Sequence, residues 1–151
     1  MSLGLIILAA IVLLLAVVAL LVVAIIRASA RTLAQRTAAI EAEVTGNAAR
    51  GERLLCPPTF ARIRRGRMTT RAVVALTNER VIVSGPSRTD VPLAEVMGAR
   101  SQRSYNGELW SGAAFVVLAS RAGEVGIAIR AADAPRWLDA IQPSLGKGGA
   151  S

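Results

Sequence analysis

Residues 3–26 read LGLIILAAIVLLLAVVALLVVAII, with eighteen Leu, Ile or Val, five Ala, one Gly and no charged side chain. As a helix that rises about 1.5 Å per residue, this stretch is about 36 Å long, which exceeds the thickness of a hydrocarbon core of about 30 Å. Inserting its aliphatic side chains into a bilayer is favourable by about 7 kcal/mol. We therefore expect a single transmembrane helix at residues 3–26, and the rest of the chain is interpreted outward from it.

Two alternatives compete with a membrane span. A cleaved signal peptide has a basic N-terminal region and an apolar core of about 7–15 residues. Ala28-Ser29-Ala30 fits a cleavage site, but Met1 and Ser2 are not basic and the apolar run is too long. A buried helix of a soluble protein is the other alternative, and a chain of 151 residues has little core in which to bury it.

Flanking charge predicts the orientation of the span. No Lys or Arg precedes it, whereas Arg27, Arg31 and Arg36 follow it closely. Because basic residues favour the cytoplasmic side, we expect the N-terminus outside, the C-terminal part in the cytoplasm and the protein in the plasma (inner) membrane as a single-pass protein.

The composition narrows the chemistry that the chain can perform. Its net charge is +8, and arginine outnumbers lysine 17 to 1, a bias typical of GC-rich bacterial genomes. Cys56 is the only cysteine, so no internal disulfide can form. The chain has no histidine, which removes the commonest general base and the commonest metal ligand. We expect no enzymatic activity, no cofactor and no metal.

The segment after the span, residues 27–50, is expected to be a juxtamembrane helical stalk that ends in a hinge. Residues 27–44 are rich in good helix formers. A narrow stripe of Leu33, Thr37, Ile40 and Val44 faces either solvent, as a plain stalk, or a partner helix. Thr45-Gly46-Asn47 is expected to end the helix, because Gly and Asn tolerate the left-handed cap conformation.

From Glu52 onward the pattern has a period of two, which is typical of antiparallel strands. We expect one domain at residues 51–142, made of six or seven short strands followed by one helix. A first strand at 53–56 should be broken by Pro57-Pro58, and Thr77-Asn78-Glu79 and Asn106-Gly107 should form hairpin turns. The other strands are expected at residues 60–64, 71–76, 80–84, 95–104, 113–119 and about 124–130.

One amphipathic helix is expected to close the domain. Asp133 can cap it, Pro135 suits its first turn, and Trp137, Leu138 and Ile141 share one face. A Gly-rich tail at residues 143–151 is expected to be disordered.

Two short motifs resemble a known family. They are Leu76-Thr77-Asn78-Glu79-Arg80-Val81-Ile82-Val83, and Val91-Pro92-Leu93-Ala94-Glu95-Val96. With the leading Gly51-Glu52-Arg53-Leu54 and the aromatic Trp137 in the final helix, they resemble bacterial pleckstrin-homology-like (PH-like) and GRAM-like domains. The resemblance implies a bent antiparallel barrel whose end is capped by the helix, and it implies no catalytic residue.

Two candidate sites emerge from the residues. The first is a cluster of arginines with no acidic residue between them in the sequence, and its positive charge suits the binding of phosphate groups. A solvated edge, an anionic lipid and an acidic protein partner remain alternatives for it, while the scarcity of stacking aromatics argues against nucleic acid. The second is a loop whose aromatics either contact a partner or pack over the barrel. The cluster consists of Arg62, Arg64, Arg65, Arg67 and Arg71, and the loop carries Tyr105 and Trp110.

These observations lead to two hypotheses. In the first, the chain is a non-catalytic, membrane-anchored PH-like adaptor that presents its barrel to a protein or an anionic lipid at the cytoplasmic face. In the second, it is a structural accessory subunit of a larger envelope or transport complex, and the span itself forms part of the interface. The span contains few small residues and no charge, which favours the adaptor.

Overall fold

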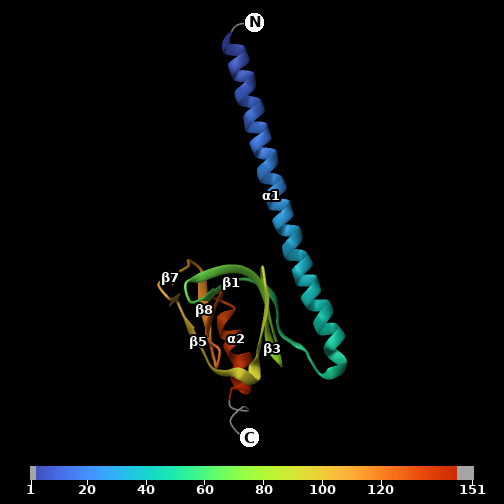
Figure 1. Ribbon diagram of the computed structural model, residues 1–151, viewed down its shortest axis with the longest axis vertical. Coiled ribbons are helices and arrows are strands. Elements are labelled where there is room, and N and C mark those ends of the chain that lie inside the picture. Colours follow the sequence, from blue (N-terminus) through green and yellow to red (C-terminus); the bar gives the residue numbers. More distant parts are fainter. Residues whose placement is uncertain (1–2, 146–151) are drawn as a thin grey trace. The chain divides into compact units, whose positions relative to one another are not determined.

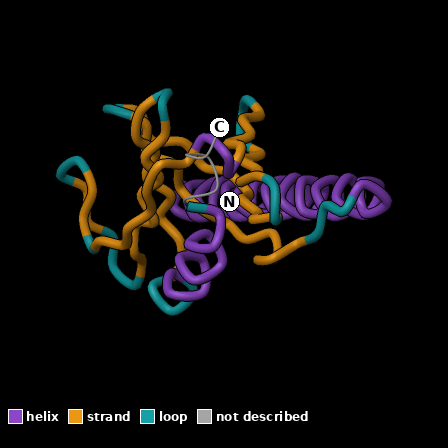
Figure 2. Tube along the Cα trace, turned by 90° about the horizontal axis from the view of Figure 1, so that it is seen from below, coloured by secondary structure: helices purple, strands orange, loops and turns teal. Residues whose placement is uncertain are grey.

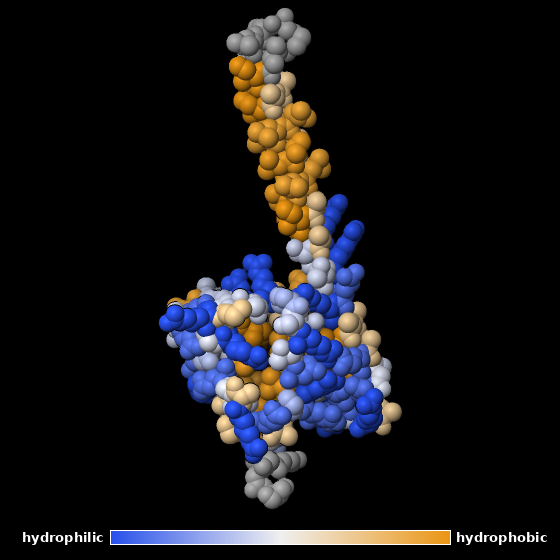
Figure 3. Space-filling model, in the orientation of Figure 1, coloured by the Kyte–Doolittle hydropathy of each residue, from blue (hydrophilic) through white to orange (hydrophobic). Residues whose placement is uncertain are grey.

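The computed structural model describes residues 3–145 and contains two compact units, the first ending at Gln35 and the second beginning at Arg36. Helix α1 (Leu3–Asn47) provides all of the first unit that is described. Its apolar side chains from Ile7 to Ile26 are exposed, and Figure 3 shows that this part is apolar, whereas the surface of the β domain is mostly hydrophilic. By length and composition, α1 is able to cross a membrane.

The second unit is built on one curled antiparallel sheet (Figure 1). Its strand order is β4-β3-β2-β1-β9-β8-β5. Figure 2 shows the strands curving into a half-barrel instead of lying flat. A separate two-stranded hairpin, β6-β7, completes the β structure. The strands are β1 (Leu54–Arg65), β2 (Met68–Thr77), β3 (Arg80–Ser84), β4 (Arg88–Pro92), β5 (Val96–Gln102), β6 (Ser104–Tyr105), β7 (Glu108–Leu109), β8 (Ala113–Ser120) and β9 (Gly123–Arg130).

The expected mainly-β domain with a C-terminal helix is thus confirmed, with local differences. Pro57-Pro58 does not divide the first strand, because β1 runs continuously through it. The register with β2 shifts between Cys56 and Thr59, so a bulge accommodates the two residues that lack a backbone N–H. The segment Arg88–Pro92, which was not expected to be a strand, pairs with β3 as β4.

The concave side of the sheet is filled by helix α2 (Ala134–Ile141). Trp137 is 2% exposed and Ile141 is fully buried, in one core cluster with side chains of β1, β2, β3, β8 and β9. The expected cap is wrong in its chemistry: Asp133 does stand at the N-cap, but its carboxylate makes no capping bond and accepts a hydrogen bond from Arg130 Nε at 2.8 Å. After α2, a 3₁₀ turn spans Gln142–Ser144 and Leu145 packs on the core, so disorder does not begin at Pro143. The rest of the expected tail lies outside the described residues.

The end of α1 belongs to the β domain, which was expected to begin only at Gly51. Ile40 and Val44 are 2% and 4% exposed. On the convex side of β2 and β3, the side chains of Val73, Ala75 and Ile82 are also buried, although they alternate with residues of the core. Ion pairs from Glu43 to Arg80 in β3 and Arg88 in β4 place the end of α1 against this part of the sheet. The last two residues of the apolar stripe, Ile40 and Val44, are therefore covered by the chain's own β domain.

Helix α1 ends at Asn47, within the segment Thr45-Gly46-Asn47 that was expected to end it, but the expected left-handed cap does not lie in that segment. Helical structure continues past Gly46 as a 3₁₀ turn, η1 (Ala48–Arg50). The left-handed residue is Gly51, with φ of 90°, a conformation that glycine adopts without the strain of a side chain. The chain turns there and enters the sheet.

Candidate functional site

The arginine cluster is divided between the two faces of β1. Side chains alternate along a strand, and the register pairs Arg62 with Arg71 and Arg64 with Thr69 on the convex face. Arg65 pairs with Met68 and belongs to the opposite face, next to the turn that contains Arg67. The five residues of the cluster therefore do not converge on one ligand.

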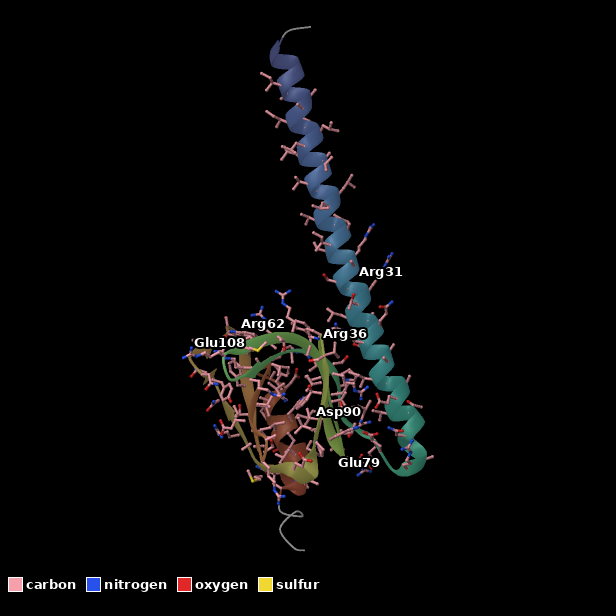
Figure 4. The ribbon with its side chains drawn as sticks, viewed as in Figure 1. Arg31, Arg36, Arg62, Glu79, Asp90 and Glu108 are labelled. Carbon is pink, nitrogen blue, oxygen red and sulfur yellow. The ribbon has the colours of Figure 1, made fainter. Side chains whose placement is uncertain are left out.

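Arg64 holds the β6-β7 hairpin against the sheet. Its Nη1 lies 2.6 Å from a carboxylate oxygen of Glu108 in β7 and 2.9 Å from the hydroxyl oxygen of Thr69. The Arg64 side chain is only 14% exposed, so this ion pair is shielded from solvent. Figure 4 shows Arg62 and Glu108 on the same side of the β domain. Arg64 is accordingly a structural residue and does not present a free charge.

The aromatic loop folds onto the same face. Tyr105 is 5% exposed, and its ring lies 5.9 Å from that of Phe115, which also contacts Trp110 at 6.0 Å between ring centroids. The guanidinium of Arg62 stacks over Trp110 at 3.8 Å. Arg62 and Arg64 of the arginine cluster thus form one assembly with the aromatic loop, in which Tyr105 packs as core.

Glycine makes this packing possible. A Cβ on Gly126 in β9 would lie 2.4 Å from a ring carbon of Tyr105. The hairpin that delivers Tyr105 turns at Asn106 and Gly107, whose φ angles of 49° and 79° are the left-handed pair of a tight hairpin turn.

Arg65 and Arg67 remain near the open end of the half-barrel. A cavity of about 320 Å³ opens there, between the β1-β2 turn and the β3-β4 turn, and we name it the mouth cavity. Its walls combine aliphatic side chains with hydroxyl groups and one guanidinium, and no acidic residue lines it. The lining residues are Ile63, Arg65, Met68, Thr70, Val83, Gly85, Ser87, Thr89, Val91 and Val125. Arg67 occupies the turn beside it and is exposed.

An adjoining cavity of about 260 Å³ shares Arg65 with the mouth cavity and does contain acids. Two of these acids are neutralised by other arginines. Asp90 pairs with Arg80 at 2.6 Å, and Glu124 pairs with Arg100 at 2.9 Å. Glu95 also lines this cavity. Glu95, which makes no ion pair among residues 3–145, is therefore the one carboxylate of this cavity that is not already paired with another arginine.

A charge network that the sequence did not reveal joins α1 to the sheet. Arg80 contacts Glu43, Glu52 and Asp90 at 2.8, 2.9 and 2.6 Å, and Arg88 bridges Glu43 and Asp90. Glu52 is 3% exposed, and hydrogen bonds from Arg80 lower its pKa from 4.5 to about 2. The pKa of Glu43 is likewise lowered, chiefly by its hydrogen bond from Arg88. Glu52 and Arg80 both belong to the motifs singled out in the sequence, but the sequence did not show that their side chains pair.

Neither a cluster of metal ligands nor an exposed cysteine occurs among residues 3–145. Cys56 is buried, and burial raises the pKa of its thiol, which disfavours the nucleophilic thiolate.

No family model matches the chain, and no curated protein matches it. Among solved structures, the chain is similar to the crystal structure of the C-terminal domain of an unknown protein from Leishmania infantum, with 12% sequence identity and a TM-score of 0.48. That similarity covers 72% of this chain and 97% of the other.

Proposed function

We propose that this protein is a non-catalytic adaptor, anchored in the plasma membrane by residues 3–26, whose PH-like domain binds an anionic headgroup through its mouth cavity. The length and apolarity of α1 support the anchor, and the basic residues Arg27, Arg31 and Arg36 that follow it support a cytoplasmic domain. The strand order, with the long β1 between the two halves of the sheet and α2 inside the curl, is compatible with the PH-like resemblance.

The observation that carries the proposal is the chemistry of the mouth cavity. Arg65 lies on its wall, three hydroxyl groups line it, and Arg67 is exposed in the neighbouring turn. Guanidinium and hydroxyl groups are the donors that phosphate oxygens bind. Arginines close to an anionic surface each contribute about 1 kcal/mol to membrane attraction. In contrast, Arg64 is ion-paired with the hairpin, and Arg62 lies outside the mouth cavity, stacked on Trp110.

The test compares vesicle binding by a fragment that begins at Arg36 and its variants. The fragment should co-sediment with phosphatidylserine vesicles at low salt and not with phosphatidylcholine vesicles. The double variant Arg65→Ser and Arg67→Ser should lose this binding and keep its melting temperature. Arg121→Ser and Arg136→Ser, two exposed arginines that do not line the mouth cavity, serve as the matched control. Equal sedimentation of the variant and the fragment would reject a headgroup site at the mouth.

The orientation is tested by cysteine labelling. Cys56 is 1% exposed and is unsuited to the assay, so it is replaced by Ala and a cysteine is introduced at the exposed Ser87. An impermeant thiol reagent should label this site only after the cells are opened. Labelling of intact cells would place the domain outside and contradict the adaptor at the cytoplasmic face.

A further inference from the structure

A groove on the convex face opens where β1 and β9 part. The two strands pair only from Arg62 to Arg64, against Ala128 to Gly126. Before Arg62, β1 remains paired with β2 but no longer with β9. The space left between Phe60 and Ile129 is bordered by the segment that leads from β7 into β8, and its volume is about 540 Å³. This size suits one or two side chains of a bound segment.

The walls of this groove carry large apolar side chains that the domain leaves uncovered. Phe60 is 48% exposed and Leu109 is 71% exposed, and the half-buried Trp110 also lines the groove. Ala128 and Ile129 form part of the lining. Scattered exposed apolar residues are ordinary, but a concave group of them is typical of a binding surface.

The charge of the groove is one-sided. Arg62 and Arg130 line it, and no Asp or Glu does. In the described part of the chain, Arg62 makes no ion pair and stacks on Trp110. Arg130 is 79% exposed and uses Nε for Asp133, which leaves its terminal nitrogens available to a second carboxylate. The groove therefore offers an apolar floor between two guanidinium groups.

We propose that this groove docks a segment of another protein in which an apolar side chain is flanked by Asp or Glu. The apolar side chain would lie against Phe60 and Leu109, and the carboxylates would bind Arg62 and Arg130. Nucleic acid suits the groove less well, because Arg62 already covers one face of the Trp110 ring on which a base would stack. A flat membrane surface would not fill a groove. This proposal describes the kind of protein segment that the proposed adaptor would bind, and it does not depend on lipid binding at the mouth cavity.

The test uses the full chain, reconstituted in phosphatidylcholine nanodiscs and screened against a display library of random short peptides. We expect enrichment of peptides that place acidic residues beside an aromatic or aliphatic one. A synthetic copy of the most enriched peptide should then bind about tenfold more weakly to each of the variants Leu109→Ser and Arg130→Ser. Met97→Ser and Arg121→Ser change exposed residues of the same types outside the groove, and these variants should bind the peptide as the parent chain does.

Three results would overturn the proposal. They are the absence of an acidic and apolar motif among the enriched peptides, equal binding by the groove variants and the parent, and loss of binding in the control variants. The groove would be a membrane contact instead if no peptide were enriched and the chain bound phosphatidylserine nanodiscs. In that case the variants Leu109→Ser and Arg130→Ser should weaken the binding to these nanodiscs. The variant Arg65→Ser and Arg67→Ser should retain peptide binding, so failure of the headgroup site and failure of the groove are separate results.

Discussion

Replacing Glu52 by Gln should destabilise the domain, because this carboxylate is the most buried member of the charge network that joins α1 to the sheet. Arg80 Nε lies 2.9 Å from one Glu52 oxygen, and Asn47 donates to the other at 2.7 Å. The fold lowers the pKa of Glu52 from 4.5 to about 2. Each pKa unit corresponds to about 1.4 kcal/mol, so the ionised form contributes about 3 kcal/mol. Gln keeps the shape and some hydrogen bonds, and we expect a loss of about 2 kcal/mol.

The pH dependence provides a second, independent check. The folded pKa lies below the unfolded one, so the contribution of Glu52 is complete above about pH 4.5 and disappears as the pH falls toward about 2. The difference in unfolding free energy between the parent and the Gln variant should therefore be largest at neutral pH and small near pH 3.

The assay is urea unfolding of a fragment that begins at Arg36, followed by tryptophan fluorescence at both pH values. Glu79→Gln is the matched control, because Glu79 is exposed and has no salt bridge in the described structure. It should change the unfolding free energy by less than about 0.5 kcal/mol. If Glu52→Gln cost no more than this control, or if its cost were independent of pH, the network would not contribute to stability as reasoned.

Three further changes test the packing. Gly126→Ala should destabilise the fragment by about 1–3 kcal/mol, measured by urea unfolding, because its Cβ would collide with the ring of Tyr105. Trp137→Ala should cost about 3–5 kcal/mol in the same assay, since α2 would lose its largest buried side chain. A fragment that begins at Gly51 should melt well below one that begins at Arg36 and should bind a hydrophobic dye, because the end of α1 no longer covers the convex face of β2 and β3.

The controls for these three changes also come from the structure. Gly98→Ala places a Cβ where no atom lies within 4 Å, and it should be nearly neutral. Met97→Ala removes a side chain that is 66% exposed and should change stability little. Equal melting of the two fragments would mean that residues 36–50 are a stalk after all.

Much of the local structure followed from sequence. The hairpin turns at Asn78 and Asn106, the strand β9 and the amphipathic α2 depend on interactions between residues close in the chain, and periodicity reports these directly. Burial along β9 does not alternate as its sequence does, because residues 125–129 are all buried. The apolar run at residues 3–26 likewise predicts a long helix without reference to any other part of the molecule. Pro57-Pro58 was misjudged because only pairing with β2 reveals that a bulge absorbs both prolines.

The site, by contrast, depended on tertiary structure. Five arginines close in sequence suggested one phosphate-binding cluster, but alternation along β1 places them on two faces of the sheet. Arg64 pairs with Glu108 and Arg62 stacks on Trp110, and each of these contacts joins residues more than forty positions apart. The stripe of Ile40 and Val44 was correctly recognised as apolar, yet whether solvent, a partner or the chain's own sheet covers such a stripe depends on long-range packing. Sequence determined which side chains are apolar, charged or turn-forming, because these are local properties. Only the fold decided which charges are neutralised and which remain to bind, because that depends on neighbours brought together from distant parts of the chain.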